Sequence, residues 1–168
     1  MKDLEPLPLS DKISGAPHPS EATTIFGQDS AQQQFLNAFD RGRLHHAWLL
    51  SGPRGVGKAT LVWKIAKFLL TTPNAPAQDG LFGAMSQHVS NLETPPDHPA
   101  LPRILAGSEP ALCVLRRSYD EKRKRFKQNI TVDDVRSLKS FFGLSAADGG
   151  ARVVIIDAAD DMTGSAAN

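Results

Sequence analysis

The chain has 168 residues, 40% of them hydrophobic, and a formal net charge of +1. This length and apolar content suit one domain with its own core, and the small charge gives no global attraction to nucleic acid or membranes. No apolar run approaches the ~20 residues of a membrane-spanning helix, so we expect no membrane contact. The single cysteine, Cys113, excludes an internal disulfide and is consistent with a cytoplasmic location.

The first part of the chain predicts an arm and then a helix. Residues 1–22 are rich in proline and polar residues, and we expect a mobile N-terminal arm there. Apolar residues recur every four positions from Ala31 to Phe39, which is the spacing of one helix face. The helix is therefore predicted to begin at Asp29 or Ser30, either of which can cap it.

A glycine-rich loop follows a second apolar run. Residues 46–50 are predicted to form a buried strand, and residues 51–60 read Ser-Gly-Pro-Arg-Gly-Val-Gly-Lys-Ala-Thr. This matches G-x-x-x-x-G-K, a loop whose backbone N–H groups and lysine hold phosphates at the start of a helix. We expect such a helix directly after the loop. The residues assigned to nucleotide contacts are Gly52, Pro53, Arg54, Gly55, Val56, Gly57, Lys58, Ala59 and Thr60.

Two positions depart from a hydrolysing site. The complete motif ends in Ser or Thr, whose hydroxyl holds magnesium, but this chain has Ala59 there. Thr60 is one position late, and one helical step rotates a side chain by about 100°. The apolar run 152–156 predicts a strand that ends at Asp157, which could bind magnesium only weakly, through water. Ala158 then stands where a hydrolysing ATPase carries a glutamate. The chain keeps groups that hold a nucleotide and lacks two that would break it.

The centre of the chain predicts the remaining elements. Residues 71–110 contain seven prolines and no strong period, so we expect loops with at most one short helix. The apolar run 111–115 predicts a strand. Thr131 and Asp134 have the spacing of a capping box and predict a helix that ends at Gly143. Alternating strands and helices favour an α/β fold with a parallel sheet.

A basic segment lies between residues 116 and 127, with two acidic residues and two aromatic residues interspersed. It could contact DNA phosphates, meet a partner protein, or form a solvated surface loop. The sequence leaves these three interpretations open. The basic residues are Arg116, Arg117, Lys122, Arg123, Lys124, Arg125 and Lys127.

Several stretches resemble the bacterial clamp-loader ATPases of the AAA+ class, and among them most of all the delta-prime family of DNA polymerase III. The resemblance implies the three-layer parallel sheet of a P-loop NTPase. It also implies that residues 23–168 form an incomplete AAA+ nucleotide-binding domain, truncated before the last core strands and lacking the lid and oligomerisation domains. The similar stretches are residues 26–28, 43–53, 120–127, 130–136 and 149–162.

The resemblance implies a role in DNA replication. Delta-prime subunits help to load the sliding clamp on primed DNA, together with the motor subunits gamma/tau and the delta subunit, and they generally do not hydrolyse ATP. By the same resemblance, Phe26, Gly27 and Gln28 would lie near the adenine of ATP or ADP. Many family members carry a four-cysteine zinc module, but residues 71–110 contain no cysteine, so zinc is not expected.

Two enzymatic alternatives remain open. An ATP-hydrolysing motor of the gamma/tau kind would carry Ser or Thr at position 59 and Glu at position 158, and usually zinc cysteines. A stand-alone P-loop phosphotransferase would turn over as a monomer without an oligomerisation domain. Measurement of phosphate release separates both from a non-hydrolysing subunit.

Overall fold

The computed structural model describes residues 7–72, 89–143 and 150–168, and a parallel pair of strands lies at its centre. β1 spans Leu112–Leu115 and β4 spans Val153–Ile156, and the two are paired along their whole length. These bounds confirm the strands predicted over 111–115 and 152–156. The fold is α/β with a parallel sheet.

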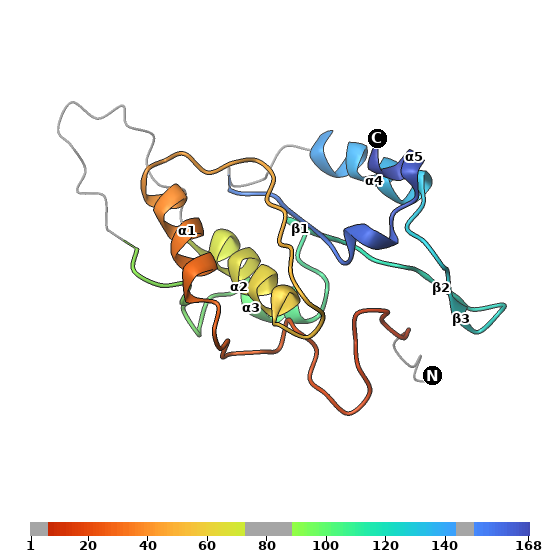
Figure 1. Cartoon of the computed structure of the whole chain (residues 1–168), viewed down its shortest axis with the longest axis horizontal. Coiled ribbons are helices and arrows are strands. Elements are labelled where there is room, and N and C mark those ends of the chain that lie inside the picture. The colour runs from red at the N-terminus through yellow and green to blue at the C-terminus, as the bar shows by residue number, and fades with distance from the viewer. Residues whose placement is uncertain (1–6, 73–88, 144–149) are drawn as a thin grey trace.

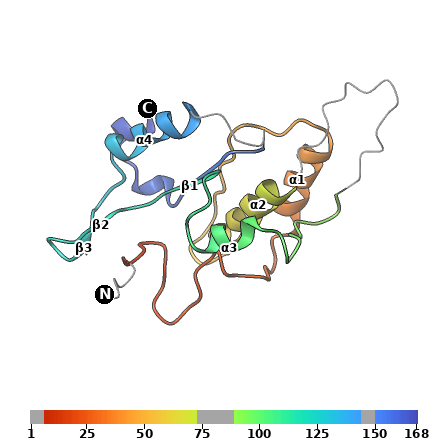
Figure 2. The ribbon, with the colours of Figure 1, turned by 180° about the vertical axis from the view of Figure 1, so that it is seen from behind.

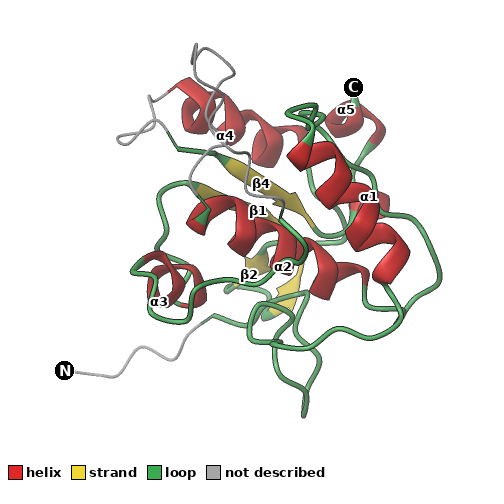
Figure 3. Ribbon diagram, turned by 90° about the vertical axis from the view of Figure 1, so that its left-hand side faces the viewer, coloured by secondary structure: helices red, strands yellow, loops and turns green. Residues whose placement is uncertain are grey.

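Helices cover both faces of this pair. α2 (Lys58–Thr71) and α3 (Ala100–Leu105) lie on one side, and α4 (Val132–Gly143) lies on the other (Figures 1 and 3). α2 contacts β4, α4 contacts β1, and the short α5 (Gly164–Ala167) packs on α4. A single-turn 3-10 helix, Ala159–Asp161, follows β4 after Asp157 and Ala158. No helix in the described ranges is long and apolar enough to cross a bilayer.

α2 is the centre of the hydrophobic core, because both of its faces are buried. Its Phe68 and Leu61 pack against Phe35 and Leu36 of α1 (Asp29–Asp40). Its opposite face contributes Trp63 and Ala66 to a second cluster. There they pack with Ala100 and Ile104 of α3 and with Ile155 of β4. Burial of the glycine-loop helix on two sides fixes the position of the loop relative to the sheet.

The short helix α3 confirms the expectation of at most one helix between residues 71 and 110 in the described part of that region. Residues 73–88 lie outside the described residues, so the prediction of loops is not tested there. α2 confirms the helix expected after the glycine loop.

The prediction of a buried strand over 46–50 is wrong. The segment has no strand assignment, Leu49 is 83% exposed and Trp48 is 40% exposed. A strand requires a neighbour for its N–H and C=O groups, and in the described structure β1 and β4 pair with each other. Two apolar side chains of the segment pack on the core without forming a strand. Leu50 packs at the edge of the core, and the centroid of the Trp48 ring lies 5.5 Å from that of the Phe35 ring.

The predicted cap of α1 is also wrong. The helix begins at Asp29, but its N-cap position is Gln28, and no side chain in the described structure caps it. Gln28 uses its side-chain amide elsewhere, donating to the carbonyl oxygen of Val56 at 2.8 Å. Asp29 instead lies within the first turn, where its carboxylate interacts favourably with the helix dipole.

A two-stranded antiparallel hairpin was not anticipated from the sequence. β2 (Tyr119–Asp120) pairs with β3 (Arg125–Phe126), and the hairpin extends away from the helices (Figure 2). Asp120 Oδ1 accepts a hydrogen bond from the backbone N–H of Arg123 at 3.0 Å, and Lys124 adopts a positive φ of 48°. The turn lacks the Gly or Asn that usually marks such a bend, so no local pattern predicts it.

The described part of the predicted N-terminal arm is packed against the domain. His18 and Ser20 are each 5% exposed, and the Asp11 side chain is 3% exposed. Proline and polar content indicated an arm without a fixed position, because these residues cannot form a core by themselves. The buried residues of this segment are held by polar contacts with the folded domain, whereas Ile13 between them is 75% exposed.

The capping box at the start of α4 is confirmed. Asp134 Oδ2 accepts hydrogen bonds from the backbone N–H of Thr131 at 2.8 Å and from its hydroxyl at 2.6 Å. Burial disfavours the carboxylate, but the Thr131 hydrogen bonds and the positive charge of Lys127 outweigh it and hold the pKa of Asp134 below its ordinary value.

We predict that Asp134→Ala lowers the free energy of unfolding by about 1 kcal/mol at pH 7, because it removes this cap. The lowered folded-state pKa means that the contribution is present above the ordinary aspartate pKa and is lost as pH falls through the folded value. Urea unfolding at pH 7 and pH 3 tests both statements. Asp133→Ala is the matched control, because Asp133 lies in the same helical turn without bonding Thr131. Equal losses for the two variants would contradict the prediction.

Candidate nucleotide-binding site

The glycine loop joins residues 46–50 to α2 and has the backbone of a phosphate-binding loop. Gly57, the N-cap residue of α2, has φ of 96°, a left-handed conformation that residues with a Cβ rarely adopt. A Cβ at this position would meet Ile25 only at 3.9 Å, so backbone conformation and not space requires glycine. The N-terminal N–H groups of α2 and the dipole of this helix are thereby directed toward the loop.

Lys58 is bonded to the loop itself. Its Nζ donates to the carbonyl oxygens of Gly52 at 2.7 Å and Pro53 at 2.8 Å. The ammonium group is therefore held over the loop, at the position from which it can pair with a phosphate. To do so it must exchange these carbonyl contacts for phosphate oxygens.

A cavity of about 310 Å³ opens beside the loop. This is at the small end of the volumes usual for small-molecule sites. Gln28 lines it and bonds Val56 of the loop, whereas Phe26 is 83% exposed and does not contribute. Of the three residues expected near the adenine, the structure therefore brings Gln28 to the loop. Loop residues in the lining are Gly52, Pro53, Val56 and Lys58.

Asp157 follows β4, and its backbone N–H donates to the carbonyl oxygen of Leu115 at 2.9 Å, which places it beside the end of β1. Burial raises the pKa of its carboxyl group, and the negative charge of Asp11 raises it further. The positive charge of Arg116 acts in the opposite direction but does not cancel these effects. Charged side chains that no sequence pattern links to Asp157 therefore act on its carboxyl group.

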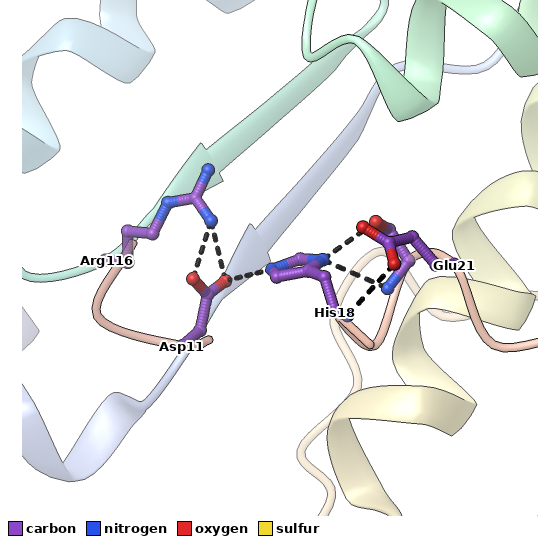
Figure 4. Close-up of polar contacts among 5 residues, drawn as sticks. Asp11, His18, Glu21 and Arg116 are labelled. Carbon is purple, nitrogen blue, oxygen red and sulfur yellow. Dashed lines mark hydrogen bonds and ion pairs between the residues drawn. The ribbon is translucent and has the colours of Figure 1, made fainter. Parts of the chain in front are cut away.

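The N-terminal segment supplies these groups. Asp11 receives two hydrogen bonds from Nη1 of Arg116, at 2.6 and 2.8 Å, and its Oδ2 lies 3.2 Å from Nε2 of His18 (Figure 4). His18 Nδ1 accepts from the backbone N–H of Ser20 at 3.1 Å, which leaves the ring proton on Nε2, facing Asp11. No sequence pattern connects Asp11 or His18 with residues a hundred positions away.

The nucleotide motifs supply few ligands for magnesium. No group of three or more His, Cys, Asp or Glu side chains in the described ranges is arranged to hold a metal ion. Ala59 offers no oxygen, and Asp157 is the single carboxylate that the nucleotide motifs supply. The arrangement can bind an anion at the glycine loop, but it provides neither the hydroxyl ligand nor the general base that ATP hydrolysis uses.

The structure divides the basic segment into two parts. Arg116 pairs with Asp11, and Arg117 Nε lies 3.0 Å from Asp161 Oδ2, so these two cations support the fold. The others lie on or next to the hairpin. The exposed hairpin cations without a described ion pair are Lys122, Lys124 and Arg125, while Arg123 lies 3.8 Å from Asp120 and Lys127 acts on Asp134.

A family model described as "DNA polymerase III, delta subunit" matches residues 27–168. The match includes the glycine loop, both strands of the parallel pair and Asp157. The chain belongs to this family. The family consists of clamp-loader subunits of the AAA+ fold, a class of protein that acts in DNA replication and generally binds nucleotide.

Curated relatives carry three subunit names. The chain is 34% identical over 128 residues to DNA polymerase III subunit delta' of Pseudomonas aeruginosa, which covers 76% of this chain and 33% of that protein. It is 49% identical over 51 residues to subunit gamma of Buchnera aphidicola subsp. Schizaphis graminum, covering 30% of this chain and 14% of that protein. It is 39% identical over 51 residues to subunit tau of Escherichia coli, covering 30% of this chain and 8% of that protein. The chain spans a third or less of the length of these relatives.

Proposed function

We propose that this chain acts as a delta-prime-type subunit of the clamp loader, which helps to place the sliding clamp on primed DNA without hydrolysing ATP efficiently. One observation carries the proposal: a correctly shaped glycine loop with Lys58 in place lacks both the hydroxyl at position 59 and the carboxylate at position 158. The similarity to a delta' protein over 128 residues, against 51 for gamma, supports this choice.

The proposed partners follow from this role. They are the motor subunits gamma/tau and the delta subunit, with the sliding clamp and primed DNA reached through the complex. ATP or ADP would lie at Gly52–Thr60 with the adenine near Gln28, and any magnesium would be held weakly, through water at Asp157. The proposed location is the cytoplasm, where replication takes place in bacteria.

A motor function of the gamma/tau kind is the second candidate. The 49% identity to a gamma subunit favours it, although only over 51 residues. The motor would require hydrolysis, for which Ala59 and Ala158 provide no groups.

The deciding experiment is size-exclusion chromatography of the full-length protein with purified motor and delta subunits. Elution as one complex supports the proposal, whereas separate elution of the folded protein contradicts it and favours a stand-alone phosphotransferase. Lys58→Ala is the informative companion variant. It is expected to assemble as well as the unchanged protein, because the proposed role does not depend on hydrolysis.

We further propose that the hairpin binds the phosphate backbone of DNA, because Lys122, Lys124 and Arg125 are exposed and make no described ion pair. Lys124→Gln is expected to weaken binding to duplexes of any sequence and to reduce the slope of log affinity against log salt by about 0.9. Fluorescence anisotropy across a salt series measures this. Lys139→Gln, which removes an exposed charge on α4, is the control. Equal slopes for the two variants would contradict the proposal and leave a protein contact or a solvated surface loop as the interpretation of the hairpin.

A further inference from the structure

The N-terminal segment crosses the edge of the sheet where a nucleotide would be expected to bind. In open α/β sheets, ligands lie outside the carboxyl ends of the strands. β1 ends at Leu115, directly before Arg116, and β4 ends at Ile156, directly before Asp157. Arg116 is held by Asp11 of the N-terminal segment, and the charges of Asp11 and Arg116 both act on Asp157. We call residues 9–23 the strap.

The strap is fixed at three places, by two sets of polar contacts and one ring contact. Its first contact is the double hydrogen bond from Arg116 to Asp11, whose side chain is 3% exposed. Its second is the His18 ring, which lies edge-on to Trp63 of α2 with ring centroids 5.5 Å apart. Its third is Lys67 of α2, whose Nζ donates to the carbonyl oxygens of Ser20 at 3.0 Å and Ala22 at 3.3 Å.

The strap also continues directly to the glycine loop. Ile25, two residues beyond it, lies next to Gly57, and Gln28 bonds the carbonyl oxygen of Val56. The same stretch of chain therefore connects the edge at Asp157 with the loop that would hold phosphates.

We propose that the strap is an intramolecular latch, in which the Asp11 carboxylate occupies Arg116 and competes with the phosphates of a nucleotide for this edge of the sheet. A carboxylate and a phosphate are alternative partners of one guanidinium group, since both accept its paired N–H donors. The apparent affinity for nucleotide is then the intrinsic affinity reduced by the fraction of molecules in which the latch is open. The proposal rests on the glycine loop binding nucleotide and not on assembly with other subunits.

The test compares Asp11→Asn with Asp97→Asn, which removes the same charge at an exposed position outside residues 9–23. A fluorescent ATP analogue measures affinity, and hydrogen exchange of residues 9–23 reports the latch directly. If the latch is open in about a tenth of the molecules, removing it with Asp11→Asn should make all of them competent to bind. Asp11→Asn should then bind the ATP analogue about tenfold more tightly than Asp97→Asn does. Adding ATP to the unchanged protein should speed exchange across the strap.

A second pair of variants gives an answer even when Asp11→Asn folds poorly. Lys67→Gln weakens the strap without touching Arg116, and Lys139→Gln is its control. Lys67→Gln should also raise affinity for the ATP analogue relative to its control. The latch proposal is overturned if, in each pair, the variant binds the ATP analogue no more tightly than its control, or if no variant binds the analogue. It is also overturned if ATP leaves hydrogen exchange of residues 9–23 unchanged or makes it slower. The chromatography described above is independent of these outcomes, so failure of the latch and failure of the subunit assignment are distinguishable.

Discussion

Phe68→Ala is expected to lower the free energy of unfolding by about 3–5 kcal/mol, the usual loss for removing a buried phenylalanine. Phe68 is 2% exposed, and its ring centroid lies 4.9 Å from that of Phe39 and 6.2 Å from that of Phe35. These edge-on contacts join α2 to α1, so the cavity left by alanine would lie at the junction that positions the glycine loop. Much of the stability of a small domain would be lost.

Urea unfolding followed by circular dichroism measures this loss. Phe26→Ala is the matched control, because Phe26 is 83% exposed and its truncation should change stability by less than about 0.5 kcal/mol. A loss below about 1 kcal/mol for Phe68→Ala would show that α1 and α2 do not form one packed unit.

The parts of the fold that the sequence predicts are those coded by local patterns. The apolar run at 152–156 contains mostly β-branched residues and becomes β4, and the Thr131 and Asp134 pair forms the cap of α4 as expected. The glycine loop is recognisable because Gly57 must adopt a conformation that other residues avoid. Each of these features depends on neighbours within a few positions.

The parts that could not be predicted depend on distant partners. Whether residues 46–50 form a strand depends on which segment lies beside them, and their own composition does not contain that information. The position of the strap depends on one ion pair between Asp11 and Arg116, residues separated by 105 positions. For the same reason the sequence located the glycine loop and Asp157 but not the groups that surround Asp157.

The chain is expected to release phosphate from ATP no faster than its Lys58→Ala variant. A positioned general base contributes ~10² to 10⁴ in rate, and Ala158 offers no proton acceptor. Ala59 supplies no oxygen for magnesium, and Lys58 is bonded to Gly52 and Pro53. Each deficiency lowers the rate separately, so restoring one alone should achieve little.

The double variant Ala59→Ser with Ala158→Glu restores both groups and should gain at least about a hundredfold in phosphate release, the lower end of a general base's contribution. Ala59→Ser with Ala159→Glu is the matched control, because it carries the same charge one residue further along, where the carboxylate no longer follows Asp157 directly. Radiolabelled phosphate release with ATP in excess measures both double variants, the unchanged chain and Lys58→Ala. Motor-like turnover by the unchanged chain that Lys58→Ala abolishes would make it a hydrolysing subunit. A gain confined to the Ala158→Glu combination would show that the loop and the end of β4 still form one site, in which the two alanines are what prevents catalysis.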